Sequence, residues 1–200
     1  WLPDETLDAF RKYLVGIKGP LTTPVGGGIR SLNVALRQIL DLYVCLRPCK
    51  AYPGNPLNLK DGIDIVVFRE NTEDLYAGVE FNPVPEKLSN LLAEIAPAFK
   101  AFKDLAGDEY AISCKINTKK GSERIVRAAF EFARKHGRKK VTVVHKANVV
   151  RATDGLFFEE AKKVAADFPE IAVDDANVDA ICMWLLKNPM SYDVLVAPNL

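Results

Sequence analysis

The stretch Ile63-Asp64-Ile65-Val66-Val67-Phe68 decides the fold class of this chain of 200 residues. Its β-branched and almost wholly apolar composition is typical of a strand buried on both faces of a sheet. Two further strands of this kind are predicted over 140–145 and 192–196, and three helices are predicted between the strands, over 120–136, 154–167 and 178–187. Strands alternating with helices predict a layered α/β fold.

The apolar spacing in these helices also predicts their buried faces and ends. Gly137 is expected to end the first helix, and Thr153 or Asp154 to cap the second. The residues expected to face inward are Ile125, Val126, Ala129, Phe130 and Ala133 in the first helix, and Phe158, Ala161, Val164 and Ala165 in the second. Before Ile63 we expect, in order, a helix over 4–13, a strand over 15–17, a loop, a helix after Ser31 and a strand ending at Arg47.

The segment Lys18 to Arg37 is a Gly- and Pro-rich loop that runs directly into an amphipathic helix. Three successive glycines at 26–28 permit a sharp turn that exposes backbone N–H groups. Ser31 is a good N-cap, while Arg30, Asn33 and Arg37 share the face opposite the apolar one. A helix N-terminus with these donors suits an anion. The alternative is a capped surface helix after a flexible loop, but the converging donors favour an anion site.

Two more arginines are expected near this anion site. Arg47 ends the apolar run before Pro48, and Arg69 ends the strand at 63–68. In open α/β sheets, ligands collect beyond the carboxyl ends of strands. Together with Arg37, these arginines suit a ligand with several carboxylates, because each guanidinium can grip one carboxylate in a bidentate fork. For any single arginine, a surface salt bridge is the commoner role.

Three other side chains are candidates for chemistry. Tyr76 follows Arg69 by seven residues, where nearby cations favour the phenolate and bring it into proton-transfer range. Lys146 ends the strand at 140–145, and a partly buried lysine there can exchange protons. Asp179 begins an otherwise apolar helix. The alternatives are a tyrosine that only packs, an ordinary lysine at a strand end, and an aspartate that stabilises the helix dipole.

These segments resemble the isocitrate/isopropylmalate dehydrogenase family, and within it the NADP-dependent isocitrate dehydrogenases of the bacterial and archaeal type. The resemblance spans residues 1–200 and is strongest over 1–80. It rests on Lys18 to Arg37, on Leu46-Arg47-Pro48, on Phe68-Arg69-Glu70-Asn71-Thr72-Glu73-Asp74 and on Tyr76-Ala77-Gly78. Ser31 and Asn33 are the discriminating pair, since relatives acting on isopropylmalate carry apolar side chains in that helix.

The resemblance implies the isopropylmalate/isocitrate dehydrogenase-like layered α/β/α fold. Residues 1–42 would be part of a large domain, and residues 43–73 with 114–200 a small α/β domain. Residues 74–113 would be a clasp that locks two subunits into a homodimer with shared active sites. Trp1 in place of Met, and an end at Leu200 just after a strand, lead us to expect a piece of a longer chain.

The resemblance also implies roles for the candidate residues. The catalytic acid–base pair would be Tyr76 and Lys146, and Asp179 would be one ligand of Mg²⁺ or Mn²⁺. In the family, Lys146 and Asp179 serve the site of the opposite subunit. Isocitrate would be bound by Ser31, Asn33, Arg37, Arg47 and Arg69, and NADP, rather than NAD, would lie beside Lys18, Thr23 and Asn148. Ser31 would also be a candidate phosphorylation site.

The implied activity is the oxidative decarboxylation of isocitrate to 2-oxoglutarate in the tricarboxylic acid cycle. Two alternatives stay open: a relative acting on homoisocitrate or isopropylmalate, and a non-catalytic tricarboxylate-binding regulatory subunit. The net charge of +1 gives no steering toward nucleic acid, and the sequence carries neither a membrane span nor a signal-peptide pattern. Four cysteines without a CxxC pair suit reduced thiols in the cytoplasm.

Overall fold

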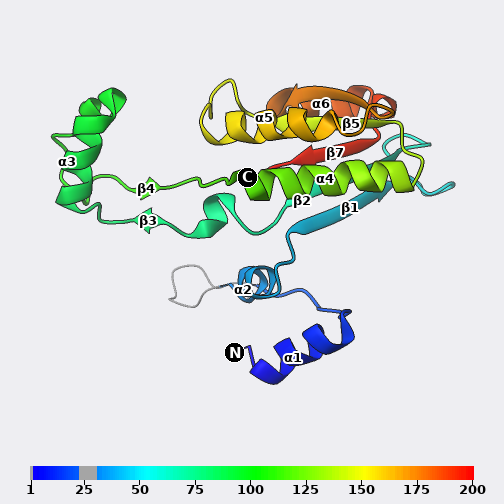
Figure 1. Ribbon diagram of the computed structural model, residues 1–200, viewed down its shortest axis with the longest axis horizontal. Helices are drawn as coiled ribbons and strands as arrows, with labels where there is room; N and C mark the ends of the chain where they lie inside the picture. The colour runs from blue at the N-terminus through cyan, green and yellow to red at the C-terminus, as the bar shows by residue number, and fades with distance from the viewer. Residues whose placement is uncertain (1, 23–30) are drawn as a thin grey trace.

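The structure is a computed structural model that describes residues 2–22 and 31–200 (Figure 1). The predictions for Thr23, for the glycines at 26–28 and for Arg30 lie outside these residues. The α-helices are α1 (Asp4–Tyr13), α2 (Leu32–Ile39), α3 (Glu86–Ile95), α4 (Lys119–Lys135), α5 (Thr153–Ala165) and α6 (Val178–Lys187). The strands are β1 (Val44–Lys50), β2 (Asp64–Glu70), β3 (Glu80–Phe81), β4 (Ile112–Ser113), β5 (Lys140–His145), β6 (Ala172–Asn177) and β7 (Val194–Ala197).

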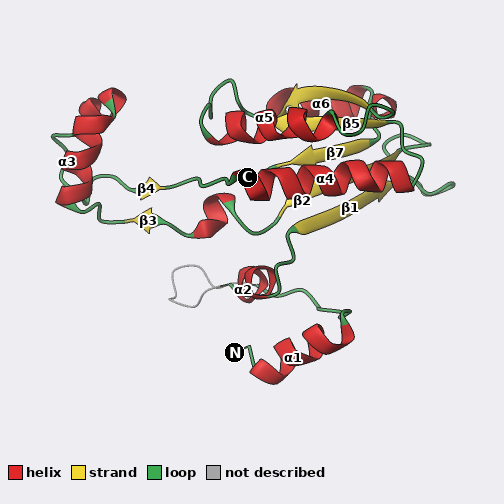
Figure 2. Ribbon diagram, in the orientation of Figure 1, coloured by secondary structure: helices red, strands yellow, loops and turns green. Residues whose placement is uncertain are grey.

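Five strands form the main sheet, in the order β1-β2-β7-β5-β6 (Figure 2). The strands β2, β7, β5 and β6 run parallel, and β1 pairs with β2 in the antiparallel sense at one edge. The helices α4 and α5 pack on one face of the sheet and α6 packs on the other. This arrangement confirms the predicted layered α/β fold.

Alternating residues of the central strands build a separate core on each face of the sheet. Val66, Val143 and Val196 pack with α4 and α5, whereas Ile65 and Leu195 pack with Ile181 of α6. Both alternating sets are apolar because helices cover both faces. This is why the strands have the continuous apolar sequences from which they were predicted.

The predicted helices are also present, with ends within about two residues of those expected. All five residues predicted to face inward on α4 are fully buried. Gly137 adopts a φ of 66° just after α4, the left-handed conformation that favours glycine at a helix end. The expected cap of α5 is wrong: Ala152 holds the N-cap position, and the Asp154 carboxylate instead accepts the backbone N–H of Lys146 at 2.7 Å.

Three elements differ from the sequence prediction. The strand expected to end at Arg47 continues to Lys50 as β1 and runs antiparallel to β2, so that Arg47 lies within the strand, opposite Val67, and not at the carboxyl ends of the parallel strands. The strand expected over 15–17 does not form, although these residues are described, and Val15 and Ile17 extend into solvent. Conversely, β6 was not predicted because Asp174 and Asp175 interrupt its apolar pattern. As an edge strand, β6 pairs with β5 alone and tolerates those carboxylates.

Residues 74–113 leave the sheet as an extended arm (Figures 1 and 2). The arm begins with a 3-10 helix, η1 (Asp74–Ala77), continues through the short β3–β4 pair and carries α3 at its far end. On another side of the sheet, α1 and α2 form a separate layer. The division into a large-domain part, a small domain and a dimerisation clasp stays a prediction. Among the described helices, none is long and apolar enough to cross a bilayer.

The base of the arm is attached to the N-terminus of α4 by a partly buried carboxylate. Glu73 accepts the backbone N–H of Thr118 at 3.0 Å and its hydroxyl at 2.8 Å. The Thr118 hydroxyl oxygen in turn accepts the Gly121 N–H at 2.9 Å, which caps α4. Burial raises the pKa of Glu73, and the two Thr118 hydrogen bonds oppose that rise. A methyl group added at Gly121 would overlap the Glu73 carboxylate.

We therefore expect Gly121→Ala to destabilise the protein by about 1–3 kcal/mol, because Glu73 would have to leave Thr118. The measurement is urea denaturation followed by circular dichroism. Gly155→Ala in α5 is the matched control, since nothing lies within 4 Å of the position its methyl group would take. This control should be neutral or gain up to about 1 kcal/mol of helix propensity. Equal stabilities for the two variants would contradict the packing argument.

Candidate functional site

The 3-10 helix η1 places Tyr76 between two of the predicted arginines. The guanidinium carbon of Arg37, from α2, lies 5.9 Å from the centre of the Tyr76 ring. That of Arg69, from the end of β2, lies 5.7 Å from the same centre. Segments far apart in the sequence thus bring two cations to one phenol, which is an arrangement able to hold anionic groups beside a proton donor.

Two hollows border α2 near this cluster. The first, the helix hollow, has a volume of about 320 Å³, and its lining includes Lys18, Asn33, Arg37 and Arg47. The second, the tyrosine hollow, has a volume of about 540 Å³ and is lined by Ser31, Val34, Glu80 and residues 75–78, which include Tyr76. Of the five residues predicted to bind the substrate, Asn33, Arg37 and Arg47 therefore line the helix hollow and Ser31 lines the tyrosine hollow, whereas Arg69 lines neither.

Within the helix hollow, two side chains have contacts to neighbouring groups. The Arg47 Nε donates to the Cys45 sulfur at 3.1 Å, since the two residues share one face of β1. The Asn33 amide nitrogen donates to the carbonyl of Leu21 at 3.4 Å. Ser31 stands at the N-cap position of α2, as predicted, and its carbonyl accepts the Ala35 N–H at 3.0 Å, but its side chain forms no capping hydrogen bond to the helix.

A third hollow, the sheet-edge hollow, lies at the carboxyl ends of the parallel strands and has a volume of about 740 Å³. Its lining includes Arg69, Lys146 and Asp179. The Lys146 ammonium lies 2.6 Å from an Asp179 carboxylate oxygen, and the side chains are 30% and 66% exposed. The hydrogen bond from Lys146 is the main reason that the pKa of Asp179 is lowered, and backbone N–H groups at the start of α6 add to it.

Sequence reasoning missed the residues that surround Lys146 and Arg69. Lys115 forms ion pairs with two buried carboxylates, Asp74 and Asp154. The Arg69 Nε donates to the carbonyl of Asn199 at 2.9 Å, and the Asn199 amide donates to the carbonyl of Glu73, also at 2.9 Å. Only Asp154 could have been suspected from the sequence, because it lies eight residues after Lys146.

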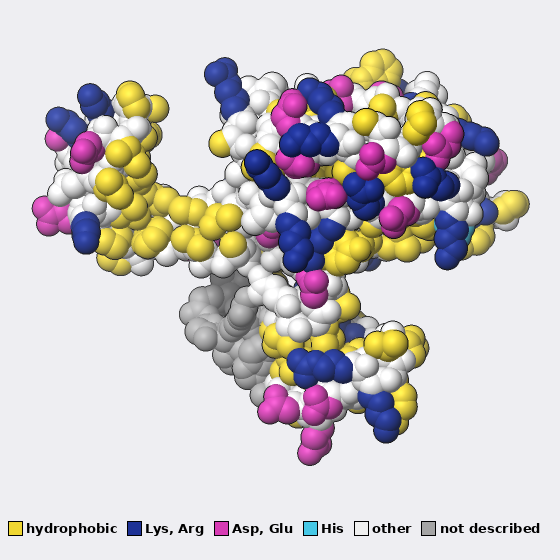
Figure 3. All heavy atoms as spheres, in the orientation of Figure 1, with side chains coloured by type: hydrophobic (Ala, Val, Ile, Leu, Met, Phe, Trp, Pro, Cys, Tyr) yellow, Lys and Arg dark blue, Asp and Glu magenta, His cyan; other side chains and the backbone are white. Residues whose placement is uncertain are grey.

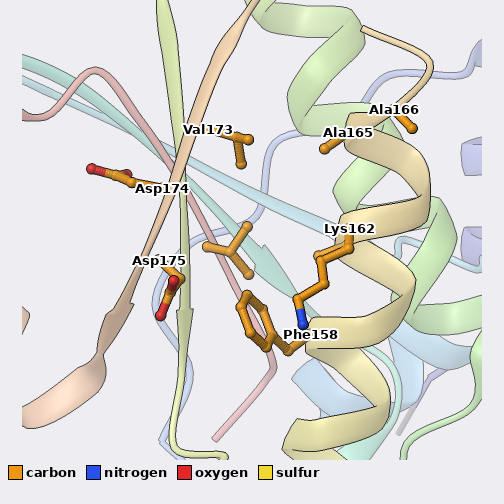
Figure 4. A pocket seen from close by; sticks show the side chains of 9 residues that line it. Phe158, Lys162, Ala165, Ala166, Val173, Asp174 and Asp175 are labelled. Carbon is orange, nitrogen blue, oxygen red and sulfur yellow. The ribbon is translucent and has the colours of Figure 1, made fainter. Parts of the chain in front are cut away.

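Another hollow, of about 430 Å³, lies between α5 and the edge strand β6 (Figure 4). Phe158 and Lys162 of α5 face Val173 across it, whereas Asp174 points away from α5. The Lys162 ammonium lies 4.2 Å from the centre of the Phe158 ring. None of the predicted site residues that the structure describes lines this hollow.

Comparison with known proteins identifies the family of this chain. The family model described as isocitrate/isopropylmalate dehydrogenase matches residues 1–200. The chain belongs to the isocitrate/isopropylmalate dehydrogenase family. It is 48% identical over 235 residues to "Isocitrate dehydrogenase [NADP]" of Staphylococcus aureus, and 43% identical over 226 residues to the protein of that name from Pseudomonas aeruginosa. These matches cover the whole chain but only 56% and 53% of the two relatives.

A solved structure agrees with the family assignment. The isocitrate dehydrogenase of Methylococcus capsulatus superimposes with a TM-score of 0.83 at 45% identity, covering all of this chain and 53% of that one. The fold is therefore the isocitrate/isopropylmalate dehydrogenase fold, as the resemblance implied. This chain spans about half the length of the relatives that it matches.

One described side chain, Asp179, has the chemistry of a metal ligand. The exposed Asp179 carboxylate is a hard oxygen ligand of the kind that Mg²⁺ and Mn²⁺ take. No group of three or more potential metal-ligating side chains forms within residues 2–22 and 31–200. Asp179 would fit such a cation as one ligand, and the described residues alone do not make a complete site. Asn148 lies on an exposed turn two residues after Lys146.

The Lys146–Asp179 pair predicts a measurable shift in titration. We expect Lys146→Met to raise the pKa of Asp179 toward its ordinary value, because the main group that stabilises the carboxylate is removed. In the parent protein, the lowered pKa means that the pair forms above the ordinary aspartate pKa and is lost as the pH falls through the lowered value. The measurement is a carbon-13 NMR titration of the carboxyl groups.

Lys162→Met is the matched control for this titration. Lys162 is the main cause of a lowered pKa at Glu159, an exposed pair on α5. That variant should raise the pKa of Glu159 and leave Asp179 unchanged. An Asp179 titration that does not move in Lys146→Met would show that the 2.6 Å contact is not kept in solution.

Proposed function

We propose that the whole protein catalyses the oxidative decarboxylation of isocitrate to 2-oxoglutarate and CO₂, with reduction of NADP. The convergence of Arg37 and Arg69 on Tyr76 carries this proposal. Two guanidiniums from different elements suit a substrate with several carboxylates, and the phenol between them suits a proton donor. The relatives named above as NADP-dependent isocitrate dehydrogenases support it.

Each candidate substrate-binding or acid–base residue has a proposed role in this reaction. Arg37, Arg47 and Arg69 hold substrate carboxylates, while Ser31 and Asn33 read the distal one. Lys146, acting as the neutral amine and through a water molecule, accepts the proton of the C2 hydroxyl as hydride leaves carbon 2, after which CO₂ is lost from the β-keto acid. Tyr76 then gives a proton to carbon 3, which completes 2-oxoglutarate.

Two sets of residues would hold the cofactors. We propose that Lys18, Thr23 and Asn148 lie beside NADP, whose nicotinamide supplies the hydride acceptor. A bound Mg²⁺ or Mn²⁺, with Asp179 as one ligand, would stabilise negative charge on the C2 oxygen and on the enolate. A place in the tricarboxylic acid cycle and in the cytoplasm follows from the same assignment.

We further propose that the protein is a homodimer with shared active sites. The arm exposes Leu91, Ile95, Phe102 and Leu105, and apolar side chains follow it along one side (Figure 3). A continuous apolar surface of this kind is typical of an interface. Lys146 and Asp179 border a different hollow from Ser31 and Tyr76, which suits a site completed by the partner's copy. Sedimentation velocity should give a dimer, and a monomer at micromolar concentration would contradict this proposal.

Two alternatives have specific discriminators. A relative acting on isopropylmalate would need an apolar surface at α2, where this chain has Ser31 and Asn33. Ser31 and Asn33 would also suit homoisocitrate, and the substrate comparison below distinguishes homoisocitrate from isocitrate. A regulatory subunit would not need both Tyr76 and Lys146, and this chain has both.

Placing a negative charge at Ser31 tests the substrate assignment. We expect Ser31→Asp to lower the affinity of the whole protein for isocitrate by about a thousandfold. Two like charges about 4 Å apart, at an effective dielectric of about 20, repel by roughly 4 kcal/mol. The helix should remain folded, since aspartate caps as well as serine. The same argument makes Ser31 a candidate phosphorylation switch.

The measurement is isothermal titration with isocitrate and Mg²⁺, with homoisocitrate and isopropylmalate titrated in parallel. The parent should bind isocitrate most tightly and oxidise it most efficiently. Ser31→Ala is the matched control and should lose about tenfold or less, because it removes only one hydrogen bond. Tighter binding of isopropylmalate, or a Ser31→Asp affinity within tenfold of the parent, would overturn the assignment.

A further inference from the structure

One lysine lies between two buried carboxylates at the point where the arm meets the sheet. The Lys115 ammonium is 3.0 Å from an Asp74 oxygen and 2.9 Å from an Asp154 oxygen. The exposed fractions of these side chains are 16%, 1% and 3%, respectively. The three residues come from the chain before α4, from η1 and from the first turn of α5, so the ammonium joins three separate segments.

Each carboxylate belongs to a segment that supports one of the two proposed acid–base residues. The second Asp154 oxygen accepts the backbone N–H of Lys146 at 2.7 Å. Asp74 stands two residues before Tyr76 in the same four-residue 3-10 helix, and its own carboxylate accepts the Leu75 N–H at 2.7 Å. Lys115 therefore connects the backbone that carries Lys146 with the backbone that carries Tyr76.

The backbone around this bridge leaves little freedom. The Asp74 N–H donates to the carbonyl of Ile116 at 2.8 Å, beside Lys115. The Leu200 N–H donates to Asp74 at 3.2 Å, and the Lys115 ammonium donates to the Leu200 carbonyl. Asp74 itself adopts a φ of 74°, an uncommon conformation for a residue with a side chain. Such a conformation persists where surrounding contacts determine it.

Stability alone is a weak explanation for this bridge. A buried ion pair often contributes no more than an apolar replacement of the same shape, because desolvation offsets the attraction. What the bridge provides is fixed geometry: two ion pairs, of 3.0 and 2.9 Å, hold the Lys115 ammonium between two almost inaccessible carboxylates that belong to different segments. Proton transfer depends on such geometry, since a small misplacement of an acid or base slows the chemical step.

We propose that Lys115 is a positioning residue that holds Tyr76 and Lys146 in a fixed relation through Asp74 and Asp154. This inference rests on the roles given to Tyr76 and Lys146 in the proposed function. In the proposed homodimer, Tyr76 serves the active site of its own subunit and Lys146 that of the partner, so the bridge also links the two sites. Loss of the bridge then slows the chemical step while the arginines continue to bind the substrate.

The test is Lys115→Met in the whole protein. Turnover (kcat) should fall by between about tenfold and a hundredfold, with the dissociation constant for isocitrate changed by less than about threefold. Lys115→Arg should restore most of the turnover, since a guanidinium can bridge two carboxylates. Lys140→Met is the matched control, because Lys140 pairs with Asp174 at 3.0 Å elsewhere on the sheet. It should change neither quantity by more than about twofold.

A second variant covers the case in which Lys115→Met fails to fold. Lys115→Met combined with Asp154→Asn keeps the net charge of the cluster and keeps an oxygen for the Lys146 N–H. It should fold and still show the loss of turnover, because Asp74 and residue 154 are no longer joined. Turnover equal to that of the parent in the folded double variant would overturn the proposal.

Amide hydrogen exchange supplies a readout that needs no activity. In Lys115→Met, exchange at residues 74–78 and 146–152 should accelerate by about tenfold relative to the rest of the chain. A uniform acceleration, with unchanged kcat per folded molecule, would mean a structural role only and would overturn the proposal. A parent active on isopropylmalate instead of isocitrate would defeat the substrate assignment alone. The bridge would then be tested with that substrate.

Discussion

The architecture depends on a buried carboxylate at the exit of β2. Glu70 is 2% exposed and accepts the Thr72 N–H at 2.8 and 3.0 Å, the Thr72 hydroxyl at 2.7 Å and the Glu73 N–H at 2.9 Å. These bonds fix a turn, residues 70–73, to which four separate segments of the chain form hydrogen bonds. Its partners include Gln38 of α2, Leu42 before β1, Thr118 and Arg124 of the α4 region, and Asn199 after β7. A buried charge satisfied by four hydrogen bonds can hold such a turn, because removing any donor would leave the carboxylate under-satisfied in a low dielectric.

The sequence predicts the centre of the sheet well and its margins poorly. Residues 140–145 and the inward face of α4 were predicted from their apolar pattern alone, because a site packed on both sides admits little but apolar side chains. The edge strand β6 carries Asp174 and Asp175, which are tolerated where one side of a strand has no neighbour. At Val15 and Ile17 a strand was predicted and does not form, since β-branched residues do not form a strand without a sheet to join.

The residues of the candidate site likewise fall into those that the sequence predicts and those that it does not. Arg69, Tyr76 and Lys146 follow strands or turns with clear local patterns, so their placement near a sheet edge could be predicted. The role of Lys115 could not be predicted from the sequence, because its partners Asp74 and Asp154 lie about 40 residues to either side of it. Nothing local in a sequence distinguishes a lysine that bridges buried carboxylates from one on a solvated helix face. Burial of a charged group is a tertiary property.

The layer formed by α1 and α2 joins the sheet through polar contacts rather than a shared apolar core. Gln38 donates to the carbonyls of Thr72 and Tyr76, both at 3.1 Å, and Arg124 binds both oxygens of Asp41 at 2.8 and 2.9 Å. Polar junctions of this kind permit relative motion of the parts that they connect. Arg37 lies on one side of the junction and Arg69 on the other. A polycarboxylate gripped by both would therefore span the junction, so part of its binding energy would act to bring the two layers together around the Tyr76 phenol.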